Sequence, residues 1–342
     1  MQTSLVTGGA GFIGSHLVEA LLAAGRRVLV IDDLSTGSAA NLQKVQGHPN
    51  LQLVIDSISN KTRLAELVRQ ADEVYHLAAV VGVRLVLEDP VRTVATNVDP
   101  TETLLRLCAG SGDARTTGVD SQPKPLFLAS TSEVYGKNPK SPLAEDDDLV
   151  LGPTSKGRWI YACSKAMDEY LALSYARSGL PVIIGRFFNV VGPRQVGRYG
   201  MVLPRFVDQA LADGPLVVYD DGRQVRCFAH VSDIVRAVQE LMACPAARGR
   251  VFNLGSDEPV TIRSLAEKVV AAVRDQETRA QLAIEHIPYA TAYAAGFEDI
   301  QCRVPDLTRI RETIDYRPRH RLDDIIREVV AWKRGRNHES HE

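Results

Sequence analysis

The sequence predicts an α/β fold built on a doubly wound parallel sheet, with a smaller α+β lobe attached. Two observations lead to this prediction. Short apolar runs alternate with amphipathic segments over the first 190 of the 342 residues. Beyond that point the alternation breaks, and loops rich in glycine, proline and charged residues take its place. Alternating strands and helices favour a parallel sheet because each helix carries the chain back to the same end of the sheet.

The chain opens with a strand, a helix and a second strand, which we place over residues 3–7, 15–24 and 28–31. The turn after the first strand has glycine at every third position. There, Gly8 permits a tight turn, Gly11 lets a pyrophosphate approach the backbone, and Gly14 lets the helix pack close to the strand. The helix N-terminus suits an anion. Asp32, after the second strand, would accept hydrogen bonds from ribose hydroxyls and repel a 2′-phosphate, so the unit predicts a Rossmann domain that binds NAD rather than NADP.

The later elements follow from the same patterns. Further strands are expected over 51–56, 74–79, 126–130, 181–186 and 251–254, and further helices over 62–70, 88–109, 161–176, 231–243, 261–274 and 322–334. A hydrophilic surface loop is expected between them over 110–125. The predicted domains are an NAD-binding domain of 1–190 to which 228–256 returns, a substrate-binding lobe of 191–227 and 257–336, and a tail of 337–342.

The cofactor site should extend beyond the glycine turn and Asp32. Its further expected members are Phe12, Ile13, Asp33, Asp56, Ile58, Leu77, Ala78, Ala79, Asn97 and Ser130. Small residues at the end of the fourth strand would leave room for the cofactor. For Asp56 two interpretations stay open: a hydrogen bond to the adenine amino group, or an ordinary helix cap.

Tyr161 and Lys165 are the strongest candidates for acid–base chemistry. Their i, i+4 spacing places the phenol and the ammonium on one helix face. A nearby ammonium favours the phenolate, so we expect Lys165 to lower the pKa of Tyr161 and make it a general base near neutral pH. The preceding strand ends in Ser130, Thr131 and Ser132, whose hydroxyls could hold a substrate oxygen at the sheet edge.

With these residues, the chain resembles the extended short-chain dehydrogenase/reductases that epimerise, dehydrate or decarboxylate nucleotide sugars. The resemblance runs nearly end to end. It rests on the stretches 7–16 and 130–136, the pair Tyr161 and Lys165, and the stretches 186–194 and 221–228.

The resemblance implies a role for each matching residue. Thr131 would complete a triad with Tyr161 and Lys165, and Lys165 would also contact the cofactor ribose. The substrate would contact Asn189, Arg198, Arg226 and Arg303. Arg226 would pair with a substrate phosphate, for which a guanidinium is well shaped. For either Arg226 or Arg303 the alternative is a surface salt bridge.

The family shares oxidation at sugar C4, and the later steps separate its branches. The pair Ser132 and Glu133 departs from the Asp-Glu pair of the dehydratases. This pair, Arg303 and the stretch 158–161 resemble uronate decarboxylases, whereas the stretch 197–204 and the general run of the second lobe resemble epimerases. We expect an NAD-dependent 4-epimerase of a UDP-hexose or UDP-hexuronate, with a UDP-glucuronate decarboxylase as the alternative. Glu133 would be catalytic, or would simply cap backbone N–H groups.

The same residues disfavour two other functions on this fold. A non-catalytic NAD-sensing protein on this fold would not need Tyr161 and Lys165, and both are present. An NADPH-dependent reductase is disfavoured by Asp32.

The amino-acid composition limits the kinds of molecule that this protein is expected to bind. Lysine and arginine number 40 and aspartate and glutamate 42, which argues against a nucleic-acid partner. The five cysteines are dispersed and lack metal-binding spacing, so we expect neither disulfides nor a metal site. No signal peptide and no bilayer-spanning run is recognisable, which predicts a cytoplasmic protein. A homodimer is expected through the helix near 93–108 and the helix that carries Tyr161.

Overall fold

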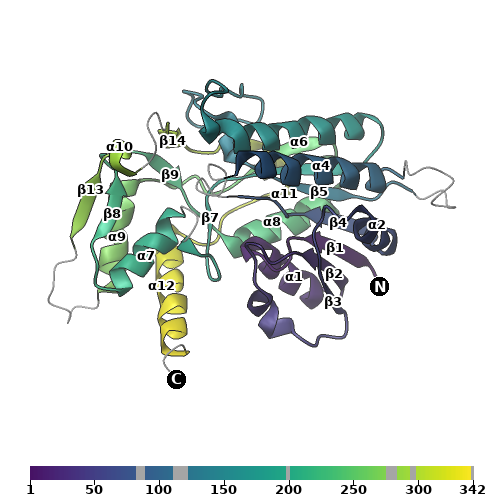
Figure 1. Cartoon of the computed structure of the whole chain (residues 1–342), viewed down its shortest axis with the longest axis horizontal. Coiled ribbons are helices and arrows are strands. Elements are labelled where there is room, and N and C mark those ends of the chain that lie inside the picture. Colours follow the sequence, from purple (N-terminus) through teal and green to yellow (C-terminus); the bar gives the residue numbers. More distant parts are fainter. Residues whose placement is uncertain (82–88, 111–121, 198–200, 275–282, 293–297, 340–342) are drawn as a thin grey trace.

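The computed structural model describes residues 1–81, 89–110, 122–197, 201–274, 283–292 and 298–339. Its centre is a seven-stranded sheet of order β11-β6-β5-β4-β1-β2-β3 (Figure 1). Every neighbouring pair in this sheet is parallel, which confirms the predicted fold class. The strands are β1 (Thr3–Thr7), β2 (Arg27–Asp32), β3 (Leu51–Ile55), β4 (Glu73–His76), β5 (Leu126–Thr131), β6 (Val182–Phe187) and β11 (Arg250–Leu254).

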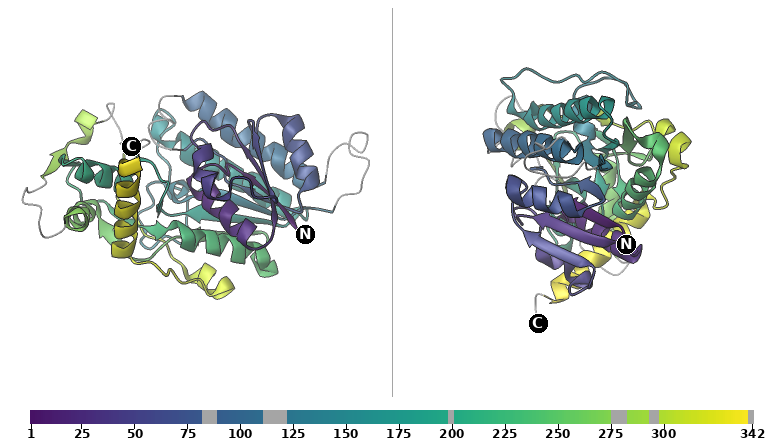
Figure 2. Two further views of the ribbon diagram at one scale, coloured as in Figure 1. Left: turned by 90° about the horizontal axis from the view of Figure 1, so that it is seen from below. Right: turned by 90° about the vertical axis from the view of Figure 1, so that its right-hand side faces the viewer.

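Helices cover both faces of this sheet (Figures 1 and 2). One face carries α2 (Lys61–Gln70), α4 (Pro90–Cys108) and α6 (Ile160–Arg177); the other carries α1 (Phe12–Ala23), α8 (Val231–Ala243) and α11 (Thr308–Ile314). Because both faces are covered, β1 is buried along its whole length, and β2 is buried from Val28 to Asp32.

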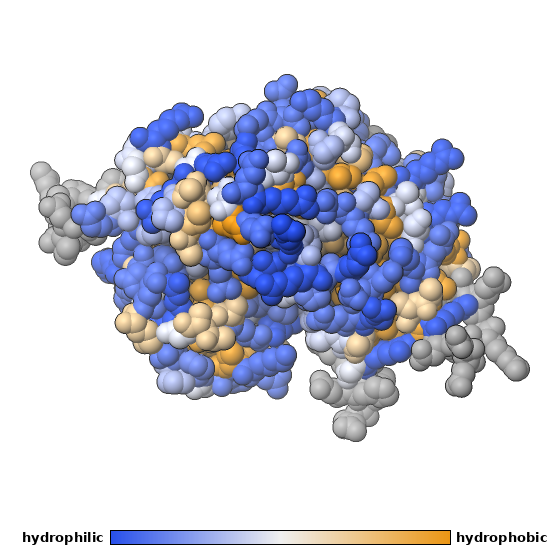
Figure 3. Space-filling view, turned by 180° about the vertical axis from the view of Figure 1, so that it is seen from behind, coloured by the Kyte–Doolittle hydropathy of each residue, from blue (hydrophilic) through white to orange (hydrophobic). Residues whose placement is uncertain are grey.

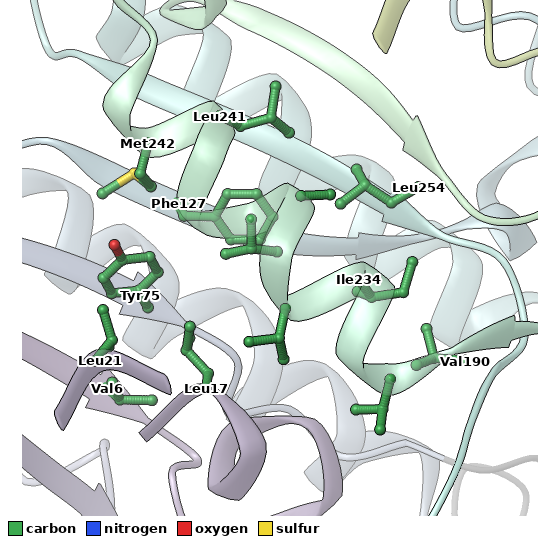
Figure 4. Packing of buried hydrophobic residues seen from close by; sticks show 14 of the residues in the cluster. Val6, Leu17, Leu21, Tyr75, Phe127, Val190, Ile234, Leu241, Met242 and Leu254 are labelled. Carbon is green, nitrogen blue, oxygen red and sulfur yellow. The ribbon is translucent and has the colours of Figure 1, made fainter. Parts of the chain in front are cut away.

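The core between the sheet and α1 and α8 shows how this packing is built. Leu17 and Leu21 of α1 lie beside Tyr75 of β4, and Leu241 of α8 lies near Phe127 of β5 (Figure 4). These side chains are at most 1% exposed. Their burial fixes α1, and with it the glycine turn at its start, against the carboxyl ends of the strands.

The second lobe is assembled from separate pieces of the chain around its own apolar core. Its small sheets have the orders β12-β9-β14 and β13-β8, and the short pair β10-β7 connects it to the main domain, whose core includes Val190 and Ala229. The strands are β7 (Val190–Val191), β8 (Leu216–Tyr219), β9 (Val225–Cys227), β10 (Ala229–His230), β12 (Pro259–Thr261), β13 (Ile284–Ile287) and β14 (Cys302–Arg303); the helices are α7 (Val202–Leu211), α9 (Ile262–Val273), α10 (Tyr289–Ala292) and α12 (Leu322–Glu339). Figures 1 and 2 place α12 between the outer part of this lobe and the main sheet.

Short 3₁₀ segments complete the fold. They are η1 (Ala39–Val45), η2 (Ser132–Tyr135), η3 (Gly157–Trp159) and η5 (Pro245–Ala247). The segments η2 and η3 bear on the site, because η2 follows β5 directly and η3 leads into α6.

The structure differs from the sequence-based expectations at one strand end and at one helix, and a predicted loop lies mostly outside the described residues. The fourth strand ends at His76, so Leu77, Ala78 and Ala79 form a loop instead of continuing the strand. Helix α11 falls inside the stretch 257–336 that we assigned to the second lobe, but it packs on β11 and α8, because Ile310 belongs to the core of the main domain. Most of the predicted loop 110–125 lies outside the described residues.

In the described part of the chain, no helix is long and apolar enough to cross a bilayer. The face of the molecule in Figure 3 is mostly hydrophilic, and its hydrophobic residues lie in small scattered groups.

Candidate active site

A cleft opens at the carboxyl ends of the central strands, where the strand order turns back between β1 and β4. It has a volume of about 960 Å³ and is lined by both lobes. The main domain contributes the glycine turn, the ends of β2 and β5 and the start of α6. The second lobe contributes, among others, Arg205, Tyr219, Phe228 and Trp332. Open α/β sheets bind ligands at this position, since loops from neighbouring strands diverge there.

The glycine turn has the shape that a dinucleotide requires. Gly8 has a φ of +70°, and a Cβ there would lie 2.8 Å from the backbone nitrogen of Ala78. A Cβ at Gly14 would lie 2.1 Å from the carbonyl oxygen of Gly8, so only glycine allows α1 to start so close to the strand. At Gly11 a Cβ would meet only that same oxygen, at 3.1 Å. The helix N-terminus is therefore open to an anion, and the residues present fit NAD.

Asp32 ends β2 at the wall of the cleft. Its carboxylate accepts a hydrogen bond of 2.9 Å from the N–H of Ala10 in the glycine turn and another of 2.9 Å from the N–H of Leu34. Burial raises the pKa of Asp32, and these backbone hydrogen bonds oppose the rise. Asp32 thus ties the glycine turn to β2 while it lines the cleft. Asp33 is exposed and also lines the cleft.

Most of the expected cofactor residues lie in the cleft wall. They are Gly8, Gly11, Phe12, Ile13, Gly14, Asp32, Asp33, Ile58, Leu77, Ala78, Ala79 and Ser130. Asp56 and Asn97 are not among the lining residues. The Asp56 carboxylate accepts hydrogen bonds from Ser57 and Asn60 at the start of α2. Asn97 is buried and accepts a hydrogen bond of 2.8 Å from the N–H of Val80, so it braces the loop after β4.

Thr131, Glu133 and Tyr161 come together at the end of β5. All three line the cleft, and the Thr131 hydroxyl accepts a hydrogen bond of 3.2 Å from the backbone N–H of Glu133. Burial strongly raises the pKa of Tyr161, and the Glu133 carboxylate raises it further; the nearby Thr131 hydroxyl and the charge of Arg303 act in the opposite direction. The phenol is therefore a proton donor at neutral pH in this structure.

The expected effect of Lys165 on Tyr161 is not what this structure shows. Lys165 is 2% exposed and does not line the cleft, and its Nζ forms an ion pair of 2.8 Å with the Asp168 carboxylate. A carboxylate one turn further along α6 compensates the ammonium charge, and the pKa of Tyr161 is raised instead of lowered. The i, i+4 spacing indicated the shared helix face but not this third member.

Arginines surround Glu133. Its carboxylate pairs with Arg158 at 2.6 Å and with Arg303 at 3.6 Å. Burial alone would raise the pKa of Glu133, but Arg158 and then Arg303 outweigh it and hold this pKa below its ordinary value. Burial and then repulsion from Arg226 lower the pKa of Arg303 to about 10. Glu133 is therefore a carboxylate held between cations, and its contacts go well beyond a backbone cap.

The remaining predicted substrate residues lie nearby. Arg226 lines the cleft and contacts the Asp299 carboxylate at 3.3 Å. Asn189 also lines it, and its amide donates a hydrogen bond of 2.8 Å to the carbonyl of Cys227. Ser132 is buried behind the wall, where it accepts a hydrogen bond of 3.3 Å from Arg303. Arg198 lies outside the described residues.

Two residues of the site had no assigned role from sequence. Arg158 stands three residues before Tyr161, so η3 and the first turn of α6 bring both into the cleft wall. The three-residue spacing from Tyr161 could therefore have identified Arg158 as a site residue from the sequence. Asp299 gave no such signal, because only the folding of the chain brings it to Arg226.

Comparison with known proteins agrees with this site. The family described as GDP-mannose 4,6 dehydratase matches residues 5–329. A UDP-N-acetyl-alpha-D-glucosaminuronate decarboxylase of Bacillus cytotoxicus is 40% identical over 331 residues, which cover 96% of this chain and 97% of that protein.

Solved structures of two other activities are also similar. A UDP-N-acetylglucosamine 4-epimerase of Methanobrevibacter ruminantium, in complex with UDP-N-acetylmuramic acid, has a TM-score of 0.83 and 29% identity, covering 98% of this chain and 99% of that one. The dTDP-glucose 4,6-dehydratase DesIV of Streptomyces venezuelae, with NAD and TYD bound, has a TM-score of 0.83 and 29% identity, covering 99% and 98%. The chain therefore belongs to the GDP-mannose 4,6-dehydratase family, among the NAD-dependent epimerases, dehydratases and decarboxylases of the extended short-chain dehydrogenase/reductases.

Proposed function

We propose that this protein decarboxylates a UDP-linked uronate, either UDP-glucuronate or UDP-N-acetylglucosaminuronate. The observation that carries the proposal is the position of Arg303 beside Glu133 and Tyr161. Three arginines, Arg158, Arg226 and Arg303, stand against two carboxylates in this part of the wall. The buried Nε of Arg303 has no hydrogen-bond partner among the described residues. This excess of positive charge suits a substrate that carries a carboxylate near the reacting carbon.

The proposed reaction begins with oxidation at C4 of the sugar. Thr131 holds the C4 hydroxyl and Tyr161, once deprotonated, accepts its proton. NAD supplies the chemistry of accepting the C4 hydride and later returning it. The resulting 4-keto sugar is a β-keto acid, so its C5–C6 bond breaks, CO₂ leaves, and the electron pair forms an enolate over C4 and C5. A proton then adds at C5, and Tyr161 protonates O4 when the hydride returns. Overall, one UDP-linked uronate and one proton give one UDP-linked pentose and one CO₂.

The arginines would assist this sequence through charge. Arg303 is placed to hold the carboxylate during oxidation. Burial is the main cause of the lowered pKa of Arg303, and repulsion from Arg226 adds to it. An anionic substrate would relieve that repulsion.

The relative with 40% identity also supports decarboxylation over epimerisation, because the epimerase structure shares only 29%. Epimerisation remains the second candidate, since the shared first step needs only Thr131, Tyr161 and NAD. An epimerase of a neutral UDP-hexose has no need of a carboxylate-binding arginine beside the reacting carbon, and release of CO₂ separates a decarboxylase from a UDP-hexuronate 4-epimerase.

The deciding experiment supplies the purified protein with four substrates in matched pairs: UDP-glucuronate against UDP-glucose, and UDP-N-acetylglucosaminuronate against UDP-N-acetylglucosamine. Products are followed by NMR and released CO₂ is trapped. We expect a UDP-pentose and stoichiometric CO₂ from one of the uronates. Interconversion of C4 epimers without loss of mass would overturn the proposal in favour of an epimerase.

A further inference from the structure

A second cluster of ionisable side chains lies outside the cleft wall, where α12 meets β10. It consists of His230 at the end of β10, His320 just before α12, and Glu328 in the second turn of α12. One potential ligand atom from each lies within 4.8 Å of the others. The two imidazole rings are 4.2 Å apart between centroids and tilted by 34°. We expected no metal site because of the spacing of the cysteines, whereas this cluster is formed by two histidines and a glutamate.

His230 presents an unsatisfied nitrogen to this cluster. The residue is 4% exposed, and its Nε2 lies 3.2 Å from a Glu328 carboxylate oxygen without forming a well-directed hydrogen bond. Its Nδ1 lies 2.7 Å from the hydroxyl of Ser232 and accepts a hydrogen bond of 3.3 Å from the backbone N–H of Ser232, and these contacts fix the ring. An ion bound at Nε2 requires the ring proton to lie on Nδ1 instead, where the Ser232 hydroxyl can accept it.

His320 is oriented by a carboxylate behind it. Its Nδ1 lies 2.9 Å from Asp233, which also accepts hydrogen bonds from the backbone N–H groups of Arg319 and His320. The Nε2 of His320 is therefore the nitrogen left for another partner. A histidine whose second nitrogen is held by a carboxylate or hydroxyl is the usual arrangement around a bound metal ion.

We propose that His230, His320 and Glu328 bind a divalent transition-metal ion, of which Zn²⁺ is the best fit. Two imidazole nitrogens and one carboxylate oxygen form a ligand set that zinc uses, with water in the fourth position. Bonds of about 2.0–2.2 Å require the three groups to draw closer together. Glu328, with 45% of its side chain exposed, and His320, with 32%, have room to move. The ion would join α12 to β10, and Trp332, one turn beyond Glu328, lines the cleft.

The test uses the whole protein, stripped with a chelator and kept free of NAD and nucleotide sugar. Its result is therefore independent of the proposed reaction. Zn²⁺ is titrated by calorimetry, and Co²⁺ is added as a spectroscopic probe. We expect one ion per chain, visible cobalt absorption of a four-coordinate site, and a higher melting temperature with zinc.

Variants locate the ion. His320→Ala and Glu328→Gln change partly exposed residues and should each weaken zinc binding by at least about tenfold, as removal of a ligand does. The matched control His286→Ala removes an exposed histidine on β13 and should bind as the unmodified protein does. The proposal is overturned if the unmodified protein binds no ion, or if His320→Ala and the unmodified protein bind zinc equally, in which case the cluster is an ion-pair network between α12 and β10.

Discussion

The Glu133 carboxylate and the Arg158 guanidinium form an ion pair of 2.6 Å in the cleft wall, with 15% and 6% of their side chains exposed. Removing one member of such a pair leaves the other charge poorly compensated. We expect Arg158→Met to lower the free energy of unfolding by about 3 kcal/mol, at the low end for buried pairs because Glu133 is partly open to the cleft.

A double-mutant cycle measured by urea denaturation checks this expectation. Glu133→Gln combined with Arg158→Met should cost less than the sum of the two single changes, because the loss of the Glu133–Arg158 interaction is counted in both single changes and only once in the double change. Strict additivity would show that the two residues are not coupled.

Tyr161→Phe should abolish most turnover and leave the fold intact. The phenol is the only proposed proton carrier at O4, and general acid–base groups contribute about 10² to 10⁴ in rate. Turnover of the active uronate is followed by NMR, and NAD binding by calorimetry serves as the control. Unchanged turnover would show that Tyr161 is not the proton carrier at O4, whereas absence of turnover in the unmodified protein with every nucleotide sugar would favour a non-catalytic NAD-sensing protein.

Arg303→Gln tests where the substrate carboxylate binds. Loss of a charge-assisted contact of about 1.5–3 kcal/mol predicts a fall in kcat/KM for the uronate of about ten- to a hundredfold. The affinity for UDP alone should hardly change. Arg311→Gln, an exposed arginine on α11 that pairs with Asp257, is the matched control. If UDP affinity falls as far as kcat/KM does, then Arg303 contacts a phosphate and not the sugar.

His76 predicts an acid-sensitive fold. It lies between Thr7 and Thr101 next to the glycine turn, and burial, helped by Lys165, lowers its pKa to about 3. The unfolded chain binds a proton near pH 6.5 and the folded chain does not, so stability is complete above that pH. It should fall by about 1.4 kcal/mol for each pH unit between about 6.5 and 3.

Urea titrations between pH 8 and 4.5 measure this slope. His76→Gln should be less stable at pH 8 but lose less stability on acidification. His286→Gln, which removes a surface histidine, should keep the slope of the unmodified protein. Equal slopes in all three proteins would exclude His76 as the cause.

The exposed apolar residues of α4 and α6 support the proposed homodimer. Val91, Val94, Met167 and Tyr170 are between 43% and 78% exposed on these two helices, which pack against each other. We expect a dimer by light scattering at micromolar concentration and a monomer for Met167→Glu. Ile55→Glu changes an equally exposed residue on β3, away from these helices, and should stay dimeric. A monomeric unmodified protein would exclude the dimer.

Much of the fold and the cofactor site follows from local sequence. The glycine turn, the strand that ends in Asp32 and the alternation of strands with helices act over a few residues each, so their spacing alone predicts the parallel sheet and the NAD cradle. The same holds for Tyr161, whose place on α6 follows from helical periodicity. The end of one strand and the domain membership of one helix did not follow from local sequence. Strand β4 ends at His76, and α11 packs in the main domain.

The electrostatics of the site were decided only by the tertiary structure. Asp168 compensates Lys165, and burial raises the pKa of Tyr161, although the i, i+4 spacing of Tyr161 and Lys165 predicted the opposite shift. Arg158 reaches Glu133 across 25 residues, and Arg303 reaches Ser132 across 171. A pKa and an ion pair depend on desolvation and on every charge within a few ångströms. The sequence by itself determined the scaffold and its cofactor, because these rest on short-range pattern; the charge balance around the reacting carbon depended on contacts that exist only once the chain has folded.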